Sequence, residues 1–221
     1  SKRYAFGQQA NISLWNLWKL GNALYPLIGK VEGLQHILER YPHQYRLKYE
    51  AMMRAKLGLF SVQHEDISQI RVLLDLTARD AIDYNLFFRW LSDFVPEIEN
   101  FQFLNQLIQK TSYLQASSRP PIQNGWEEWM AWYAQRLSFE DKTPDQKKQL
   151  MNATNPAFVV RNYMAHEAIQ LAEKGDNSRI QLFLELMKKP YESTPENEVW
   201  MTRSPDWSFE KPGCSMLSCS S

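Results

Sequence analysis

Apolar residues recur along most of the chain at the spacing of an α-helix. In the clearest stretch, the residues at i, i+3, i+4, i+7 and i+11 are Trp126, Trp129, Met130, Tyr133 and Leu137, which places them on one helix face. Runs of alternating β-branched residues, which are typical of strands, are few. The pattern therefore predicts an all-α fold.

Helix breakers and capping residues divide this pattern into separate helices. Helices are predicted at residues 11–28, 33–57, 84–91, 97–115, 126–137 and 156–174, and further helices are predicted to begin near residues 66, 144 and 177. The helix over 33–57 is expected to end near Gly58, because glycine is common just after a helix C-terminus.

Two helix starts carry a recognisable capping signal. Asp66 is followed three residues later by Gln69, which resembles a capping box. Thr143 is followed by Pro144 and, three residues on, by Gln146, which combines a cap, a proline at the first helical position and a capping box. Both positions are therefore predicted to be helix N-termini.

The last two predicted helices precede a change in pattern. Asn155-Pro156 repeats the cap-plus-proline signal and should open the helix that ends at Gly175. Asp176 can cap the next helix, whose predicted buried stripe consists of Ile180, Phe183, Leu184 and Met187.

Breaks in the pattern suggest three parts. Residues 117–121 read Ser-Ser-Arg-Pro-Pro, and the helical periodicity ends at Pro190. We therefore interpret residues 1–116 and 117–189 as two helical parts and residues 190–221 as an extended tail with scattered aromatic residues.

Composition and charge narrow the class of protein. Apolar residues make up 44% of the chain and aromatic residues 13%, enough for a packed core. The 25 basic residues are balanced by 25 acidic ones, whereas nucleic-acid binding usually needs a basic excess, so no nucleic-acid partner is expected. No uncharged apolar run approaches the ~18 residues of a membrane span, and no signal peptide is evident. Because the chain begins at Ser1 without Met, we expect it to be part of a longer protein.

Motifs for nucleotide or metal binding are missing. Neither GxGxxG nor GxxxxGK[ST] occurs. The four histidines, His36, His43, His64 and His166, do not pair with one another or with a Cys at metal-ligand spacing. The sequence therefore offers no candidate for a catalytic, nucleotide-binding or metal-binding residue.

Arg161-Asn162 and the two cysteines are the residues for which a specific role can be formulated. Arg161 could clamp a carboxylate or backbone carbonyl groups and fix helix packing, or could contact a ligand or an upstream lobe. Cys214 and Cys219 both lie in the last eight residues, which argues against a disulfide scaffold and favours a reducing compartment. On an exposed tail they would be accessible to thiol exchange, or they are incidental surface residues.

Short motifs that run in order along the chain match a known family. They are Arg3-Tyr4-Ala5-Phe6-Gly7-Gln8-Gln9 with Trp15-Asn16-Leu17, Lys56-Leu57-Gly58-Leu59, Asp83-Tyr84-Asn85-Leu86-Phe87-Phe88-Arg89, Asn155-Pro156-Ala157-Phe158-Val159-Val160-Arg161-Asn162-Tyr163, Ala168-Ile169 with Gly175-Asp176, Ser204-Pro205-Asp206-Trp207 and Ser218-Cys219-Ser220-Ser221. Gln8 and Ala10 depart from the Asn and Pro that are common there. Together the motifs resemble the selenoprotein O family of protein adenylyltransferases, in a Cys-containing form.

The resemblance implies a fold and an activity for a longer protein. This chain would be the helical part of the C-lobe of a protein-kinase-like fold with a C-terminal extension, and the intact enzyme would transfer AMP from ATP, with Mg²⁺, to protein hydroxyl groups. In the family, the glycine-rich loop and the catalytic and metal-holding residues precede the segment at Arg3, so no site residue is carried over. The implied partners are the upstream kinase-like domain and protein substrates, in the cytoplasm of bacteria or the mitochondria of eukaryotes.

The resemblance also implies a role for one cysteine. Cys219, three residues from the end, corresponds to the family's terminal Cys or selenocysteine, which would pair with a cysteine in the upstream activation segment. Cys214 is the less favoured candidate for this redox role.

Two functions remain open on the sequence. The first is the non-catalytic C-terminal region of an adenylyltransferase, and the alternative is a free-standing helical scaffold for protein interaction. In the first case the chain should expose an apolar surface where the remainder of the protein packs, for which the candidate residues are Trp15, Trp18, Phe87, Phe88 and Trp90.

Overall fold

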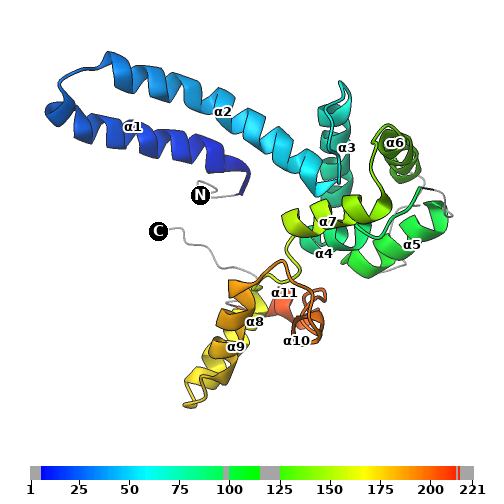
Figure 1. The fold of residues 1–221 in the computed structure, drawn as a ribbon. Helices are drawn as coiled ribbons and strands as arrows, with labels where there is room; N and C mark the ends of the chain where they lie inside the picture. The colour runs from blue at the N-terminus through cyan, green and yellow to red at the C-terminus, as the bar shows by residue number, and fades with distance from the viewer. Residues whose placement is uncertain (1–5, 97–99, 115–124, 213, 215–221) are drawn as a thin grey trace. The chain divides into compact units, whose positions relative to one another are not determined.

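The computed structural model describes residues 6–96, 100–114, 125–212 and 214. Every regular element within these ranges is helical, apart from one isolated antiparallel bridge between Ile82 and Ser112 (Figure 1). The elements are η1(Phe6–Gln8), α1(Gln9–Ile28), α2(Glu32–Lys56), α3(Asp66–Arg79), α4(Tyr84–Leu91), α5(Asn100–Thr111), α6(Trp126–Ser138), α7(Pro144–Thr154), α8(Asn162–Ala172), α9(Ser178–Lys188), α10(Pro195–Glu198) and α11(Trp207–Glu210). The prediction of an all-α fold is confirmed. None of the described helices combines the length and the apolar character that crossing a bilayer requires.

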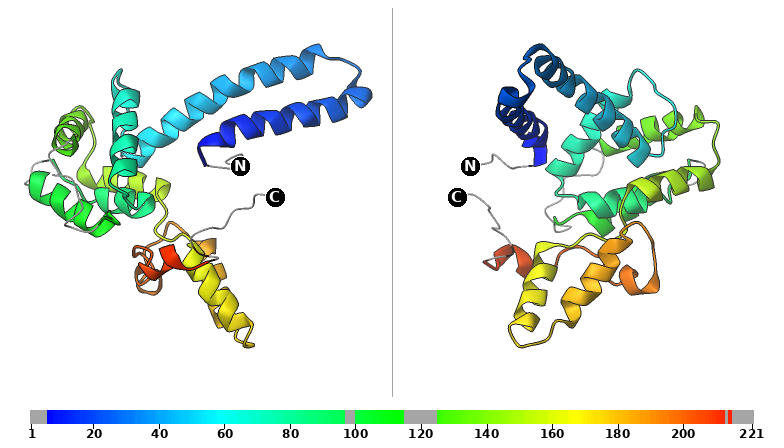
Figure 2. Two further views of the ribbon diagram at one scale, coloured as in Figure 1. Left: turned by 180° about the vertical axis from the view of Figure 1, so that it is seen from behind. Right: turned by 60° about the vertical axis from the view of Figure 1, so that its left-hand side comes forward.

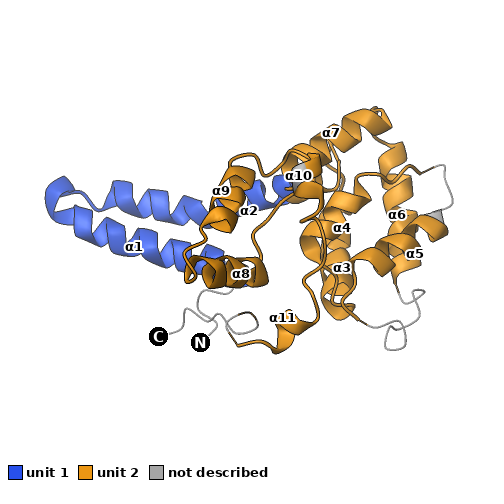
Figure 3. Cartoon of the chain, turned by 90° about the horizontal axis from the view of Figure 1, so that it is seen from below, with its two compact units in different colours: residues 1–52, 218–221 blue, residues 53–217 orange. Residues whose placement is uncertain are grey.

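The chain divides into two compact units (Figure 3). Unit 1 contains residues 1–52 and 218–221, and unit 2 contains residues 53–217. The three parts inferred from the sequence divide the chain at other places, and their boundaries remain predictions.

Unit 1 is a helical hairpin with little core of its own. The helix α1 and residues 32–52 of α2 run antiparallel (Figure 2), and no residue of α1 is buried. Gly29 ends α1 in the left-handed region, at φ +68°, which lets the chain reverse. Trp15 and Trp18, which we expected in an exposed apolar surface, are 44% and 50% exposed. The hairpin therefore leaves a large apolar surface uncovered within its own unit.

Unit 2 is organised around the aromatic face of α6. All five residues of the stripe predicted for this helix are buried. The Trp129 ring lies 5.1 Å from that of Tyr133, and Phe87 of α4 lies 5.6 Å from Trp126. Phe87 and its neighbour Phe88 are fully buried, so the expectation that they belong to an exposed surface is wrong. Their burial against α6 contributes to this core instead.

The two capping signals have different outcomes. The capping box of α7 is confirmed, since the Thr143 hydroxyl accepts from the backbone N–H of Gln146 and the Gln146 side chain accepts from that of Thr143. The box predicted at Asp66 is wrong. Asp66 is the first residue of α3, and its carboxylate accepts from Arg136 and from the backbone N–H of Gln63 instead.

The start of α8 also differs from the prediction. Asn155 closes α7 rather than opening α8, because its side-chain amide donates to the carbonyl groups of Lys56 and Met151. Pro156 has no backbone N–H, and the N–H groups of the next two residues, Ala157 and Phe158, donate to the carbonyl of Pro190 at 2.7 and 3.0 Å. These bonds keep the segment out of a helix. The helix α8 therefore begins six residues later than predicted, at Asn162.

The stripe predicted for α9 is only partly buried. Phe183 is 4% exposed and packs on Phe158 and Trp200, whereas Ile180, Leu184 and Met187 are each more than 40% exposed. The segment that follows Pro190, interpreted as extended, contains the short helices α10 and α11 in its described part. Thr194 caps the first of these with a capping box and Pro195 opens it, which explains the local helix.

Gly58 follows α2 at a position where the neighbouring helix α7 leaves no space for a side chain. Its φ is +71°, in the left-handed region. A Cβ at this position would lie 2.4 Å from Cγ of Lys147 and 3.1 Å from Cγ of Met151. Glycine is therefore required both by the backbone conformation and by the approach of α7.

Lys56, at the end of α2, is a buried lysine. Only 7% of the residue is exposed, and its ammonium group lies over the rings of Tyr84 and Phe88, at 5.0 and 4.7 Å from their centroids. Burial lowers the pKa of Lys56 to about 8 from the ordinary 10.5. The aromatic faces stabilise the cation without fully replacing its hydration.

This burial predicts a pH-dependent stability. Between pH 8 and 10.5 the folded Lys56 is neutral while the unfolded lysine is still protonated, so unfolding takes up a proton and stability rises with pH. Lys56→Met should reduce this rise in the free energy of unfolding, measured by urea unfolding at pH 7 to 10.5. The rise that remains in the variant is expected from Lys147, because burial also lowers the pKa of that lysine to about 8. The exposed Lys174→Met is the matched control. An unchanged pH profile in Lys56→Met would contradict the assignment.

Candidate functional site

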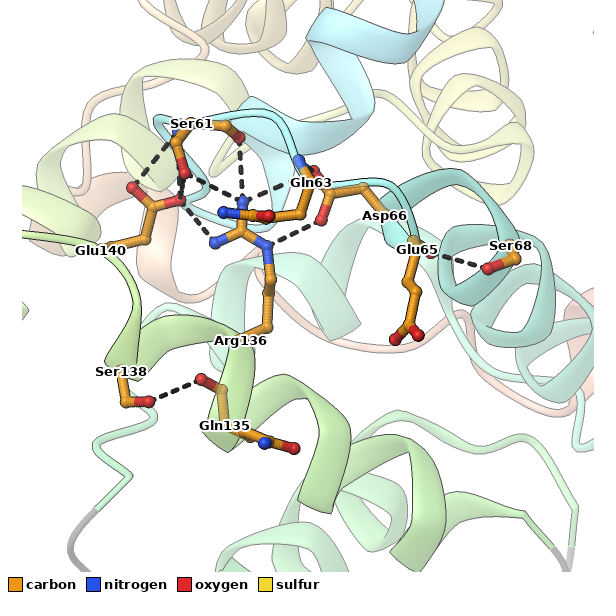
Figure 4. Close-up of polar contacts among 9 residues, drawn as sticks. All are labelled: Ser61, Gln63, Glu65, Asp66, Ser68, Gln135, Arg136, Ser138 and Glu140. Carbon is orange, nitrogen blue, oxygen red and sulfur yellow. Dashed lines mark hydrogen bonds and ion pairs between the residues drawn. The ribbon is translucent and has the colours of Figure 1, made fainter.

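The most buried ionic cluster is centred on Arg136 of α6 (Figure 4). Its Nε donates to Oδ1 of Asp66 at 2.7 Å, and its Nη1 donates to Oε1 of Glu140 at 2.8 Å. Its Nη2 donates to the carbonyl of Ser61 at 2.9 Å, while the Ser61 hydroxyl donates to Glu140 at 2.8 Å. The cluster thus joins the start of α3, the end of α6 and the loop that follows α2.

The electrostatics of this cluster are those of a closed network. Burial alone would raise the pKa of Glu140, but hydrogen bonds from Ser61 and Arg136 outweigh it and hold the pKa below its usual value. Burial would lower the pKa of Arg136, and Asp66 and Glu140 raise it instead. All three guanidinium nitrogens are engaged, and two carboxylates neutralise one cation. The charge of Arg136 is therefore neutralised within the protein.

A cleft of about 300 Å³ opens beside the cluster. It is lined by Gln63, His64, Glu65, Trp132, Gln135, Arg136 and Phe139. In the described residues no group of three or more His, Cys, Asp or Glu side chains is arranged to hold a metal ion, and His64 is the single histidine at this cleft. The cleft does not assemble an acid, a base and a nucleophile.

A second ionic cluster forms around Arg161, which is the N-cap residue of α8. Its Nη2 donates to Oδ1 of Asp83 at 3.1 Å and its Nη1 donates to Oδ2, so the carboxylate is held by both nitrogens. Asp83 also caps α4 by accepting from the N–H of Leu86, and it accepts from the Tyr113 hydroxyl at 2.5 Å. Of the two roles considered for Arg161, the structure shows the carboxylate clamp that fixes packing.

Burial and the ion pair act in opposite directions on this arginine. Burial would lower the pKa of Arg161, and the hydrogen bonds to Asp83 raise it above its usual value. Burial, assisted by the negative charge of Asp83, raises the pKa of Tyr113, which keeps its hydroxyl protonated as a donor. The cluster is therefore a permanent junction at neutral pH.

The Arg161 cluster also anchors the segment that leads to the cysteines. The backbone N–H of Ser204 donates to the Tyr113 hydroxyl at 3.1 Å, and the ring of Tyr113 lies 5.1 Å from that of Phe209. Farther along, the side-chain amide of Asn162 donates to the Cys214 carbonyl at 3.1 Å. Of the pair singled out from the sequence, Asn162 therefore binds this segment directly, and Arg161 is connected to it through the Tyr113 hydroxyl.

The structure separates the two candidate cysteines. Cys214 is 5% exposed and packs in a cluster with Phe158, Tyr163, Met164, Ala168 and Phe183. It forms no disulfide within the described residues. The expectation that its thiol is exposed on a free tail is wrong, because the Asn162 contact and this apolar cluster hold it inside. Cys219 lies outside the described residues, so its predicted redox role stays a prediction.

Several partners in these clusters could not be recognised beforehand. Asp66 and Arg136 are 70 residues apart, and Tyr113 lies 30 residues from Asp83. The one local signal is that Arg136 adjoins the predicted apolar stripe at Leu137, where a charged residue is buried only when paired.

The anchor predicts how Cys214 responds to loss of the clamp. Arg161→Met should destabilise the protein by about 3–5 kcal/mol, because it leaves the buried Asp83 without its cation. It should also raise the alkylation rate of Cys214, read by mass spectrometry so that Cys219 is resolved separately. The control is Arg46→Met, which removes a pair between an exposed arginine and the partly exposed Glu50 and should change stability by less than about 1 kcal/mol. Unchanged Cys214 reactivity in destabilised Arg161→Met would refute the coupling.

Comparison with known proteins places these features in a family. The family model described as "Protein adenylyltransferase SelO" matches residues 1–189. Protein nucleotidyltransferase YdiU of Flavobacterium johnsoniae is 40% identical over 224 residues, which cover 100% of this chain and 42% of that protein. The protein of the same name from Azoarcus sp. is 38% identical over 221 residues, covering 100% of this chain and 41% of the relative. The chain thus spans about two-fifths of the length of the curated relatives it matches. It belongs to the SelO family of protein adenylyltransferases.

Proposed function

We propose that this chain is the C-terminal helical region of a protein adenylyltransferase. The intact enzyme transfers AMP from ATP to serine, threonine or tyrosine hydroxyl groups of protein substrates, and its ATP and Mg²⁺ are held by a kinase-like domain upstream. The observation that carries this proposal is the family match over residues 1–189 in a chain that spans only about two-fifths of its relatives.

In this proposal the chain supports the catalytic domain and does not perform the reaction. The two most buried ionic clusters commit Arg136 and Arg161 to carboxylates, so neither cation is available for a triphosphate. Phosphoryl and nucleotidyl transfer depend on positioned cations and metal ions that neutralise developing charge. We place those groups outside this chain.

The exposed hairpin supports a partner in the rest of the protein. Trp15, Trp18 and Leu27 of α1 are 44%, 50% and 84% exposed, and α1 buries no residue. Soluble monomers rarely leave such apolar surfaces uncovered. We assign this surface to the upstream kinase-like domain.

The activity can be tested with the intact protein and the 221-residue chain side by side. With radiolabelled ATP and Mg²⁺, the intact protein should label protein substrates, and the chain alone should not. Calorimetry should show no ATP binding by the chain. Micromolar binding of ATP by the chain would overturn its non-catalytic role. The alternative of a helical scaffold would be favoured if the intact protein does not bind ATP and its sequence contains neither a glycine-rich loop nor a catalytic Asp.

We further propose that Cys219 is the redox-active cysteine of the intact protein. Because Cys214 is buried in the cluster around Phe158, it is the poorer candidate for thiol exchange. Peptide mapping of the intact protein without reductant should find Cys219 bridged to a cysteine of the upstream segment. A bridge at Cys214 with Cys219 unmodified would refute this assignment.

A further inference from the structure

Lys56 is the one buried charged side chain without an ion pair or a hydrogen bond in the part of the chain that the structure describes. Each of the other buried charged residues has such a partner; they are Asp66, Asp80, Asp83, Arg136 and Lys147. A lysine is rarely buried this deeply unless it is paired. The exception therefore indicates that a partner of Lys56 is missing.

The isolation of this cation is costly at neutral pH. Only 7% of the residue is exposed, and burial alone lowers its pKa to about 8, with no described charged group near enough to contribute. At pH 7 the side chain is therefore still mostly protonated. Its charge lies in the interior without a counter-ion, which is unfavourable.

Tyr84 and Phe88 of α4 satisfy this ammonium group only in part. Its Nζ lies 5.0 and 4.7 Å from the centroids of the two rings. An ammonium group has three N–H donors, and two ring faces can accept at most two of them. At least one donor therefore remains for an oxygen atom.

The ammonium group can be reached from outside. The fully enclosed side-chain nitrogen and oxygen atoms that lack a hydrogen bond in the described residues belong to Asn152, Asn155, Arg161 and His166, and Nζ of Lys56 is not one of them. The end of the Lys56 side chain thus keeps contact with the surface while most of the residue is covered. A lysine in this position can donate outward.

A carboxylate is the anion that fits this position. Phosphate groups in proteins are usually held by several cations together or by helix N-termini. Lys56 has no described cation close enough to affect its pKa, and it is the last residue of α2, at the end where the helix dipole is negative. A single carboxylate matches a single ammonium group in charge.

The part of the relatives that this chain does not match provides a source for the carboxylate, since the chain spans only about two-fifths of their length. We propose that in the intact protein the ammonium group of Lys56 forms an ion pair with a carboxylate of the part outside this chain. Lys56 is then a specific contact between the two parts. This inference rests on the proposed function only in treating the chain as a region of a longer protein.

The titration of Lys56 tests the ion pair directly. With ¹³C-labelled lysine and NMR signals assigned from Lys56→Met and Lys147→Met, Lys56 should titrate near pH 8 in the 221-residue chain. In the intact protein it should titrate at least about two pH units higher, because a carboxylate favours the charged form. Lys147 is the internal control, since it is also buried but already donates to the carbonyl of Phe94, and it should titrate near pH 8 in both proteins. An equal or lower value for Lys56 in the intact protein would overturn the proposal.

The stability of a variant gives an independent measure. At pH 7, Lys56→Met replaces an unpaired buried cation of the chain by an apolar side chain of similar length, so the urea midpoint of the chain should stay the same or rise. In the intact protein the same change leaves a carboxylate without its cation, so the midpoint should fall. The exposed Lys174→Met is the control and should change neither midpoint. A midpoint that does not fall in the intact protein, or that falls equally in the chain, would refute the ion pair.

Two further comparisons identify the anion and separate this inference from the proposed function. The titration of the intact protein is repeated with ATP and Mg²⁺, and a higher value that appears only with ATP would assign the anion to a nucleotide phosphate and reject the carboxylate. If the intact protein transfers no AMP while Lys56 titrates at the higher pH, the proposed activity fails and the ion pair stands. If transfer is normal and Lys56 titrates near pH 8, the ion pair fails and the activity stands.

Discussion

The carboxylate of Asp83 is the junction on which the organisation of unit 2 depends. It caps α4, accepts from Tyr113 just after α5 and holds Arg161 at the start of α8. Through the Tyr113 hydroxyl it also fixes Ser204. A side chain that is 3% exposed in the ion pair thus connects segments from four parts of the chain. Such a charge is tolerated in the interior only because every lone pair direction is met by a donor.

The two buried arginines show how this helical unit achieves a specific packing. Arg136 and Arg161 each join elements that are distant in the sequence, and each donates both to a carboxylate and to a neutral oxygen atom. Apolar stripes alone allow helices to slide or rotate against one another, whereas a buried guanidinium with fixed partners accepts one arrangement. The aromatic face of α6 supplies burial, and the arginines determine how the helices around it are placed.

The sequence predicted what depends on local chemistry and missed what depends on partners far along the chain. The α6 stripe, the Thr143 capping box and the bounds of α4 follow from nearby residues and were predicted correctly. Asp66 and Asn155 have the same local signals, but Arg136 and Lys56 occupy their side chains and change their roles. The clamp was foreseen at Arg161 but Asp83 was not identified as its partner, and burial of Cys214 depends on the distant contact with Asn162.

Gly58 shows that a glycine can make a junction more rigid. The aliphatic stem of Lys147 crosses the space that a side chain at Gly58 would fill, and its ammonium group continues to the carbonyl of Phe94. The absence of a side chain at Gly58 therefore leaves space for the Lys147 side chain from α7. Because Lys147 occupies this space, the left-handed turn after α2 cannot change its conformation without displacing that side chain.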